Sequence, residues 1–355
     1  AISTARAYAN VQDNLGPGVT IVNPANVTYA TSDFPLVFNV TLNEAGGTVL
    51  YTLNGGLNNF TMTANASNTG YNATNSSMAD GSYTFRVYAN DTAGNRNDTT
   101  TVVFSVDSTL IKTCTTLSTA NTVYRLNNSL TTTGTCFTIS ANNVTLNLNG
   151  FNATGDANND DDFGVSVTGY NDTTIKNGGI YNFGRGISST SGNNHTFTDL
   201  NISASGNFGL ISIIYGIFIN GRNENKITNN NISNLDNTGT SSGAYGLYIG
   251  SSSDRNTIIN NTISANKGVS DGYGLCLTNS DNNTIINNTA NSNLYDGILL
   301  DQSSDNKFEN NTFNYNSRIG IYIKGSGLNV PSKRNLISGG SISGSGQDAI
   351  VIETS

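Results

Sequence analysis

The chain has 355 residues, with 16 lysines and arginines against 24 aspartates and glutamates, and a formal net charge of -8. This length accommodates two domains, or one domain joined to a solenoid. The acidic balance and the lack of a basic run argue against nucleic acid and against an anionic membrane surface as partners.

The composition and the start of the chain indicate an exported β-protein. Charged residues make up only 11% of the chain, but aliphatic residues alternate within its Asn, Ser, Thr and Gly background, which favours ordered strands over disorder. No stretch reaches the ~18 apolar residues that a membrane span needs. The chain begins at Ala1 without Met or a charged-then-apolar leader. We expect a secreted, extracellular or cell-surface protein without its signal peptide; a trimmed chain is the alternative.

Residues 1–17 form a tail that we assign to neither domain, and residues 18–107 have the pattern of a β-sandwich. Short alternating segments separated by turns such as Asn54-Gly55-Gly56 predict the strands. These segments are Val19–Val22, Leu36–Leu42, Thr48–Leu53, Ser82–Tyr88 and Thr101–Val106.

Two stretches of this region resemble a known family. The stretch Asp80–Asn95 (DGSYTFRVYANDTAGN) resembles the penultimate strand and turn of immunoglobulin-like modules in prokaryotic, especially archaeal, surface proteins. Val19–Asn26 (VTIVNPAN) is similar to their opening strand. The resemblance covers about 90 residues and implies a spacer or stalk rather than a catalytic domain.

Glycosylation motifs of the form Asn-x-Ser/Thr are denser before residue 100 than composition predicts. They predict N-glycans on the sandwich and so an exported surface protein. The motifs begin at Asn26, Asn39, Asn59, Asn65, Asn72, Asn75, Asn90 and Asn97. In the rest of the chain the motifs occur about as often as chance allows.

Residues 108–355 carry a repeat of 22–30 residues, anchored on a small residue that is followed by an alternating strand. Repeats of this length with strands but no helical stretch predict a β-solenoid. The eight anchor strands are Gly164–Val167, Gly186–Ser189, Gly216–Ile219, Gly246–Ile249, Gly274–Leu277, Gly297–Leu300, Gly320–Ile323 and Ala349–Ile352.

Each anchor strand is followed by a second strand that ends in an Asn or Gly. This position is occupied by Asn230, Asn261, Asn288, Asn311 and Gly340, and earlier by Gly178. Because Asn and Gly tolerate positive φ, we expect it to turn the corner in a left-handed conformation, and we expect stacked Asn side chains to hydrogen-bond along the axis.

The repeat resembles the parallel β-helices of the pectate-lyase-like superfamily, including NosD-like and archaeal surface members. Cys136–Gly150 (CFTISANNVTLNLNG) looks like their opening coil. The fold prediction is therefore all-β, with an immunoglobulin-like sandwich followed by a right-handed parallel β-helix. Cys114 and Cys136, 22 residues apart, are predicted to form a disulfide that pins the first coil.

The superfamily contains lyases, hydrolases and epimerases, but no pair of carboxylates recurs on adjacent anchor strands. The basic residues that a lyase would need are scattered and do not fall at a common strand position: Arg185, Arg222, Arg255, Arg318 and Lys324. We therefore predict that the chain is not an enzyme and has no cofactor. The acidic run that contains Asp160, Asp161 and Asp162 is a weak Ca²⁺ candidate, and a solvated loop is the favoured interpretation.

An apolar stripe is predicted on the outside of the β-helix. The middle residue of each anchor strand points outward, and on the last six coils it is Phe218, Tyr248, Cys276, Leu299, Tyr322 and Val351. The stripe is roughly 25 Å long by strand spacing. The sandwich, a loop, another protomer or a stacked sugar can cover it, or it stays partly exposed.

These features favour a structural protein that self-assembles into a cell-surface filament or layer. Its expected partners are copies of itself and covalent N-glycans, with a surface polysaccharide as a further partner. The first alternative is a glycan-binding adhesin that uses Tyr248 and Tyr322. The second alternative is a polysaccharide lyase or hydrolase of the β-helix superfamily.

Overall fold

The computed structural model describes residues 13–157, 161–206, 213–221, 223–239, 243–325 and 332–353, without the side chains of residues 98 and 99. The chain divides into two compact units, Ala1–Leu110 and Ile111–Ser355. The predicted boundary lay at residues 107/108, three residues earlier. Both units are built from strands, which confirms the all-β prediction.

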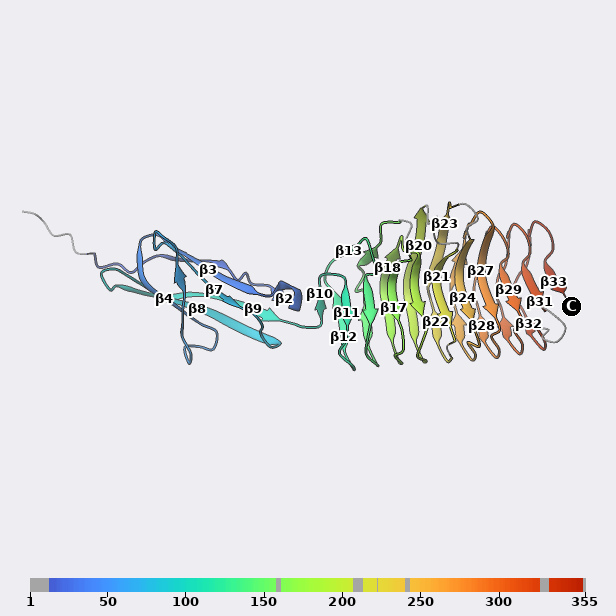
Figure 1. The fold of residues 1–355 in the computed structure, drawn as a ribbon, viewed down its shortest axis with the longest axis horizontal. Coiled ribbons are helices and arrows are strands. Elements are labelled where there is room, and N and C mark those ends of the chain that lie inside the picture. Colours follow the sequence, from blue (N-terminus) through green and yellow to red (C-terminus); the bar gives the residue numbers. More distant parts are fainter. Residues whose placement is uncertain are drawn as a thin grey trace, which may run out of the picture. The chain divides into compact units, whose positions relative to one another are not determined.

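The first unit is a sandwich of a four-stranded and a five-stranded sheet (Figure 1). The first sheet has the order β1 (Val19–Asn23), β3 (Leu36–Leu42), β7 (Gly70–Asn75) and β6 (Thr63–Ala64). The second has the order β2 (Thr28–Tyr29), β9 (Arg96–Val106), β8 (Gly81–Asp91), β4 (Gly46–Thr52) and β5 (Phe60–Thr61). A 3-10 turn, η1 (Thr31–Asp33), precedes β3. The alternating strands bury one face each, and Phe38 of β3 stacks on Phe85 of β8 at 5.0 Å between ring centroids.

Residues 13–17, predicted to be part of a separate tail, contact the sandwich instead. The Asn95 side chain donates a hydrogen bond to the Asp13 carbonyl (3.0 Å), and that of Asn97 donates to the Pro17 carbonyl (2.8 Å). A Cβ on Gly16 would lie 2.3 Å from the Arg96 carbonyl oxygen, so only glycine fits there. Side-chain amides of the β8–β9 turn thus hold this stretch; the rest of the predicted tail lies outside the described residues.

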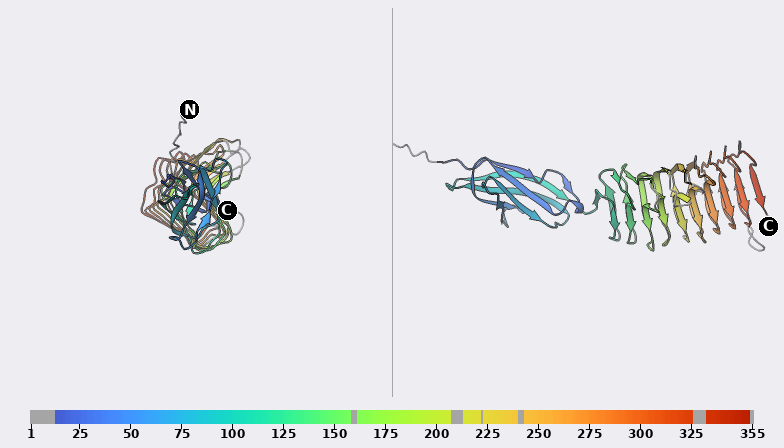
Figure 2. Two further views of the ribbon diagram at one scale, coloured as in Figure 1. Left: turned by 90° about the vertical axis from the view of Figure 1, so that its left-hand side faces the viewer. Right: turned by 45° about the horizontal axis from the view of Figure 1, so that its top comes forward.

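The second unit is a parallel β-helix whose strands follow one another along a single axis (Figures 1 and 2). One sheet has ten strands: β11 (Thr115–Leu117), β14 (Phe137–Ile139), β17 (Phe163–Val167), β19 (Arg185–Ser189), β21 (Ile213–Asn220), β24 (Gly243–Gly250), β27 (Asp271–Thr278), β29 (Ile298–Asp301), β31 (Ile321–Lys324) and β33 (Ile350–Glu353). Its strands pair in parallel. The first five predicted anchor segments lie wholly within these strands, and the last three begin one residue before β29, β31 and β33.

The other sheet of this unit has fourteen strands. Its main path is β10 (Leu110–Ile111), β12 (Val123–Leu126), β15 (Thr145–Asn147), β18 (Thr174–Tyr181), β20 (Thr196–Gly206), β22 (Lys226–Thr228), β25 (Thr257–Ile259), β28 (Thr284–Ile286), β30 (Lys307–Glu309) and β32 (Leu336–Ser338). Beside this path lie β13 (Leu130–Thr131), β16 (Asn152–Thr154), β23 (Asn231–Asn237) and β26 (Thr262–Ser264). One continuous core of aliphatic and Phe side chains fills the space between the sheets.

The anchor glycines are required for space rather than for backbone freedom. A Cβ on Gly216 would lie 2.2 Å from the Ile232 methyl and 2.5 Å from the Gly246 carbonyl oxygen of the next coil. Gly246 and Gly274 are similarly crowded. A residue without Cβ at this position therefore lets each coil pack closely on its neighbour.

Three ladders of buried Asn side chains run along the axis of the β-helix. In each ladder the side-chain oxygen of one Asn accepts hydrogen bonds from the backbone N–H and the amide of the Asn one coil earlier, at 2.8–3.2 Å. The ladders are Asn225–Asn256–Asn283–Asn306–Asn335, Asn230–Asn261–Asn288–Asn311 and Asn266–Asn293–Asn316.

The prediction that Asn230 and its counterparts take a left-handed conformation is wrong by one residue. The left-handed residue is the preceding one: Asn229, Asn260, Asn287 and Asn310 have φ of 55–58°. The second Asn of each pair points inward, because only there can its amide bond to the next coil. Gly178 is needed for space, since a Cβ would lie 2.4 Å from Leu148 Cβ; Gly340 is itself left-handed (φ 83°).

The sole histidine, His195, stands at the head of one ladder. Its backbone N–H donates to Asn225 (2.9 Å), and its Nδ1 accepts from the Thr173 N–H (3.2 Å). The ring is fully buried. A structural role accounts for these contacts.

Replacing one ladder residue should destabilise the β-helix strongly. We expect Asn288→Ala to lower the free energy of unfolding by about 3 kcal/mol, because it leaves the buried Asn261 N–H without its partner and removes the amide hydrogen bond to the Ile258 carbonyl. Denaturant unfolding followed by circular dichroism measures the change. Asn128→Ala, at an exposed position, is the control; equal midpoints for the two variants would show that the ladder contributes little.

Candidate functional site

The outer face of the ten-stranded sheet carries two columns of side chains in parallel register. The first column is Phe163, Arg185, Tyr215, Tyr245 and Tyr273. The second column is Ser166, Ser188, Phe218, Tyr248, Cys276, Leu299, Tyr322 and Val351. Residues of the first column directly precede the anchor residue, and residues of the second column follow it by two positions. The anchor residue and the residues one and three positions after it face the core, so both columns point outward.

Six rings of these coils form one connected cluster, which we call the aromatic face. Five of them are half-buried and one, Tyr273, is buried; the others are Tyr215, Phe218, Tyr245, Tyr248 and Tyr295. Phe218 and Tyr248 stack nearly parallel, with an interplanar angle of 6° and centroids 5.2 Å apart. Along the first column, Tyr245 lies 5.5 Å from Tyr215 and 4.9 Å from Tyr273. Tyr295, just before β29, continues the series at 5.2 Å from Tyr273. Ring contacts hold each aromatic in a fixed orientation.

An arginine lies at each end of the aromatic face. Arg185 sits over the Phe218 ring (4.7 Å from its centroid) and pairs with Asp161 at 3.3 Å. Arg318 lies over the Tyr295 ring at 3.8 Å and the Tyr322 ring at 4.8 Å, and its Nε donates to Asp296 at 2.8 Å. Because each guanidinium is paired with a carboxylate, neither end of the face carries a large net charge.

Burial raises the pKa of the phenol groups of this face and of the Cys276 thiol above their ordinary values. It raises the pKa of Tyr215 to about 12 and also raises the pKa of Tyr245, Tyr248 and Tyr273. Burial likewise raises the pKa of the Cys276 thiol to about 12, which makes a thiolate nucleophile unfavourable. The phenol groups of the face are therefore neutral hydrogen-bonding groups beside apolar ring surfaces.

A third, polar column runs beside the second. It consists of Asn220, Gly250, Thr278, Asp301, Lys324 and Glu353 on successive strands. The Asp301 Oδ1 atom is buried and has no hydrogen-bond partner among the described residues. Burial and a hydrogen bond to Glu353 raise the pKa of Tyr322 to about 12. A carboxylate, an amine and a phenol thus occupy neighbouring register positions on the last coils.

The six residues predicted as an outward apolar stripe do share one column, but they are not equally accessible. Cys276 is 2% exposed and Tyr322 is 9% exposed, while Phe218, Tyr248 and Leu299 are half-buried. Cys276 is small and stands in register between the larger Tyr248 and Leu299, and Arg318 covers the Tyr322 ring. Cys276 and Tyr322 therefore do not belong to an exposed stripe.

The sequence analysis missed the first column and the polar column. The first carries a visible signal, since Tyr215, Tyr245 and Tyr273 directly precede anchor glycines. The register aligns Lys324 with the acidic residues Asp301 and Glu353, an alignment that the sequence analysis did not consider. Spacings of 23 and 29 residues separate these three side chains in the sequence.

The remaining predicted residues lie away from this face. Cys114 and Cys136 form a disulfide next to the pairing of β11 with β14. Of the Ca²⁺ candidates, Asp160 lies outside the described residues. Asp161 pairs with Arg185, and Asp162 Oδ1 accepts the Gly184 N–H (2.9 Å). These two carboxylates thus serve contacts within the protein.

The eight predicted glycosylation residues all lie in the first unit. Asn26, Asn59, Asn65 and Asn72 are exposed, and Asn39, Asn75, Asn90 and Asn97 are half-buried. Elsewhere in this unit, the carboxylate oxygens of Asp13, Glu44 and Asp91 lie within 4.8 Å of one another. Asp91 already accepts two hydrogen bonds from Asn95, so part of this acidic group is committed to the β8–β9 turn.

Two family models match the chain. Residues 26–108 match the bacterial Ig-like domain, and residues 211–355 match the right handed beta helix region. These matches confirm both resemblances proposed from the sequence, and with them the handedness of the β-helix. No curated protein matches this chain. None of the described residues forms a helix whose length and hydropathy would let it span a bilayer.

Solved structures are similar at low identity. The A-module of a mannuronan C-5 epimerase from Azotobacter vinelandii is 13% identical over 67% of this chain and 82% of that chain, with a TM-score of 0.44. An alginate lyase from Paenibacillus sp. is 16% identical over 65% and 93%, with a TM-score of 0.40. A modular endo-β-1,4-mannanase from Cellulomonas fimi is 18% identical over 26% of this chain, with a TM-score of 0.21; this chain spans 18% of that chain.

The prediction that this chain is not an enzyme is contradicted, since the similar β-helices include an epimerase and a lyase. That prediction depended on finding no paired chemistry on adjacent anchor strands. It failed physically because coil register, rather than spacing along the chain, decides which side chains stand together. The Asp301–Lys324–Glu353 alignment is such a case.

The tyrosines of the aromatic face should make the protein sensitive to alkali. Above pH 10 the unfolded chain ionises Tyr215, whereas the folded state keeps it protonated until about pH 12. We expect the free energy of unfolding to fall as pH rises through this window, measured from denaturant midpoints. Tyr215→Phe should reduce this pH-dependent loss of stability, whereas Tyr315→Phe, at an exposed position, should not. Equal pH dependence of the free energy of unfolding in the wild-type protein and both variants would contradict the raised pKa of Tyr215.

Proposed function

We propose that the aromatic face of the β-helix binds a polysaccharide chain. The observation that carries the proposal is the unbroken contact of six aromatic rings across successive coils, with an arginine at each end. Sugar rings present apolar C–H faces and a rim of hydroxyls. Tyrosine rings and phenol groups match both, because they combine apolar area with a polar tip.

The geometry of the face suits an extended polymer. The rings come from β21, β24, β27 and the segment before β29, so they follow the axis at the strand spacing of ~4.8 Å. Contacts among the rings fix them before a ligand arrives, which lowers the entropic cost of binding. Because Arg185 and Arg318 are both paired, recognition depends mainly on ring stacking and hydrogen bonds.

The proposal places the protein outside the cytoplasm, where polysaccharides of walls and matrices occur. The Ig-like domain and the disulfide between Cys114 and Cys136 are compatible with that location. Self-assembly into a cell-surface filament or layer, and N-glycans on the sandwich, stay predictions. Polysaccharide binding needs neither of them.

Affinity electrophoresis in gels that contain alginate, polygalacturonate or galactomannan tests the binding. We expect at least one polymer to retard the protein, and Tyr245→Ala or Tyr248→Ala to weaken that retardation about fivefold, as loss of one stacking ring implies. Tyr315→Ala, which removes a ring that is 66% exposed but outside the aromatic face, is the matched control.

Two results contradict the proposal: no polymer retards the wild-type protein, or Tyr315→Ala weakens retardation as much as the aromatic-face variants do. Circular dichroism of each variant confirms that the β-helix stays folded.

Chemical modification of the bound polymer is a second candidate function. It is favoured by the register of Asp301 with Lys324, which places a carboxylate and an amine on adjacent strands beside Leu299 and Tyr322 of the second column. Acid–base chemistry on a sugar needs such a pair within reach of one proton. The half-buried Asp301 carboxylate is the candidate base, since its Oδ1 atom has no hydrogen-bond partner among the described residues.

Incubation with alginate and polygalacturonate, followed by ultraviolet absorbance of unsaturated ends and by NMR of the uronate configuration, tests this candidate. We expect turnover of one polymer, and a loss of at least about 100-fold in Asp301→Asn and Lys324→Met. Lys333→Met at an exposed corner is the control. Full activity of Asp301→Asn, or no turnover by the wild-type protein, contradicts catalysis and leaves the binding proposal standing.

A further inference from the structure

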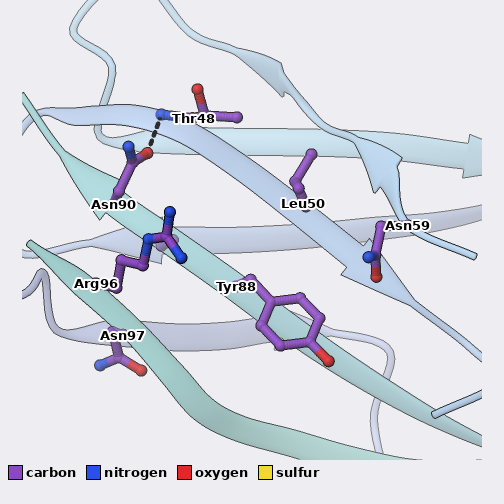
Figure 3. A pocket seen from close by; sticks show the side chains of 8 residues that line it. Thr48, Leu50, Asn59, Tyr88, Asn90, Arg96 and Asn97 are labelled. Carbon is purple, nitrogen blue, oxygen red and sulfur yellow. Dashed lines mark hydrogen bonds between the residues drawn. The ribbon is translucent and has the colours of Figure 1, made fainter. Parts of the chain in front are cut away.

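A pocket of about 400 Å³ opens on the outer face of the five-stranded sheet of the sandwich (Figure 3). Its lining residues come from three neighbouring strands, β4, β8 and β9, and from the residue just before β5. They are Thr48, Leu50, Asn59, Tyr88, Ala89, Asn90, Arg96 and Asn97. The pocket belongs to the first unit alone and is separate from the aromatic face.

Hydrogen bonds hold in place the loop between β4 and β5, which lies beside Tyr88. Thr52 Oγ1 accepts the Gly56 N–H at 3.0 Å, and the Asn54 side-chain oxygen accepts the Asn58 N–H at 3.0 Å. Gly56 comes so near the Tyr88 hydroxyl that a Cβ would lie 3.2 Å from it. On the opposite wall, the Asn90 side-chain oxygen accepts the Thr48 N–H at 2.6 Å. The pocket is therefore formed before any ligand binds.

The lining combines an apolar floor, amides and one cation. Tyr88 and Leu50 provide the apolar surface, and Arg86 lies 5.3 Å from the Tyr88 ring centroid. Figure 3 shows the Arg96 guanidinium between the Asn90 side chain and the Tyr88 ring. Arg96 forms no ion pair with another described residue, so its charge is available to a ligand. Its five donors in a planar fork match a carboxylate.

We propose that this pocket binds an acidic sugar unit. The sugar ring packs on Tyr88 and Leu50, its hydroxyls bond to the Asn amides, and its carboxylate pairs with Arg96. A neutral sugar can pack on Tyr88 and Leu50 and bond to the Asn amides, but it leaves the Arg96 guanidinium without a partner. The pocket therefore prefers an acidic sugar to a neutral one. This site is additional to the polysaccharide face of the β-helix and does not depend on it.

Two sources can supply such a sugar. Asn59 is exposed at the rim and begins the glycosylation motif Asn59-Phe60-Thr61, so an attached glycan can fold back into the pocket. The other source is a separate glycan. Both present the same chemistry to Tyr88 and Arg96.

The test uses the full chain, produced without glycosylation and labelled with ¹⁵N, titrated with D-glucuronate and with D-glucose. We expect glucuronate to shift the backbone amide signals of Thr48 and Gly56, and to bind roughly tenfold more tightly than glucose. Tyr88→Ala and Arg96→Gln should each weaken glucuronate binding by about the same factor, and Arg96→Gln should abolish the preference over glucose. Arg125→Gln in β12 is the control.

The proposal is overturned if glucuronate leaves the Thr48 and Gly56 signals unmoved, or if Arg96→Gln keeps the preference for glucuronate. Because these signals belong to the sandwich, they report on this pocket whatever happens at the aromatic face. Mass spectrometry of the Asn59 peptide from naturally produced protein then separates the sources: an acidic glycan on Asn59 assigns the pocket to the attached chain, and an unmodified Asn59 assigns it to a separate glycan.

Discussion

Hydrogen bonding between identical positions of successive coils is the constraint on which the β-helix depends. Each buried Asn of a ladder accepts from the backbone and side chain of the Asn one coil earlier, so coils cannot slip past one another without leaving buried polar groups unsatisfied. The anchor glycines add a steric condition, because a Cβ on Gly216 would meet the neighbouring coil. Together these contacts fix both the register and the separation of the coils.

A fixed register turns scattered residues into continuous surfaces. Tyr215, Tyr245 and Tyr273 are 30 and 28 residues apart along the chain, yet their rings are in contact. The same register brings Asp301 beside Lys324. The outer face of the sheet is therefore a place where function can vary without cost to the core, since the inward positions keep their aliphatic side chains.

The two units use different means to build a sugar-compatible surface. The β-helix repeats one position over several coils, which suits a polymer that extends along the axis. The sandwich has no such repetition, and its pocket lies beside a loop that Thr52 and Asn54 hold in place. A loop-bound pocket suits a single sugar unit, and Arg96 supplies the charge that the paired arginines of the β-helix do not offer.

The sequence by itself determined the fold, because the anchor strands, the Asn-Asn turns and the alternating strands of the sandwich are local patterns with one physical interpretation each. It also determined that Phe218, Tyr248 and their counterparts point outward, since strand periodicity settles that. Only the tertiary structure decided which Asn of each Asn-Asn pair takes the left-handed conformation. The second Asn is buried in a ladder, and the first therefore makes the turn with a positive φ. The tertiary structure also decided that Cys276 and Tyr322 are covered, and that Asp301 and Lys324 stand in register on adjacent strands. These depend on side-chain size and coil length, which no single repeat contains.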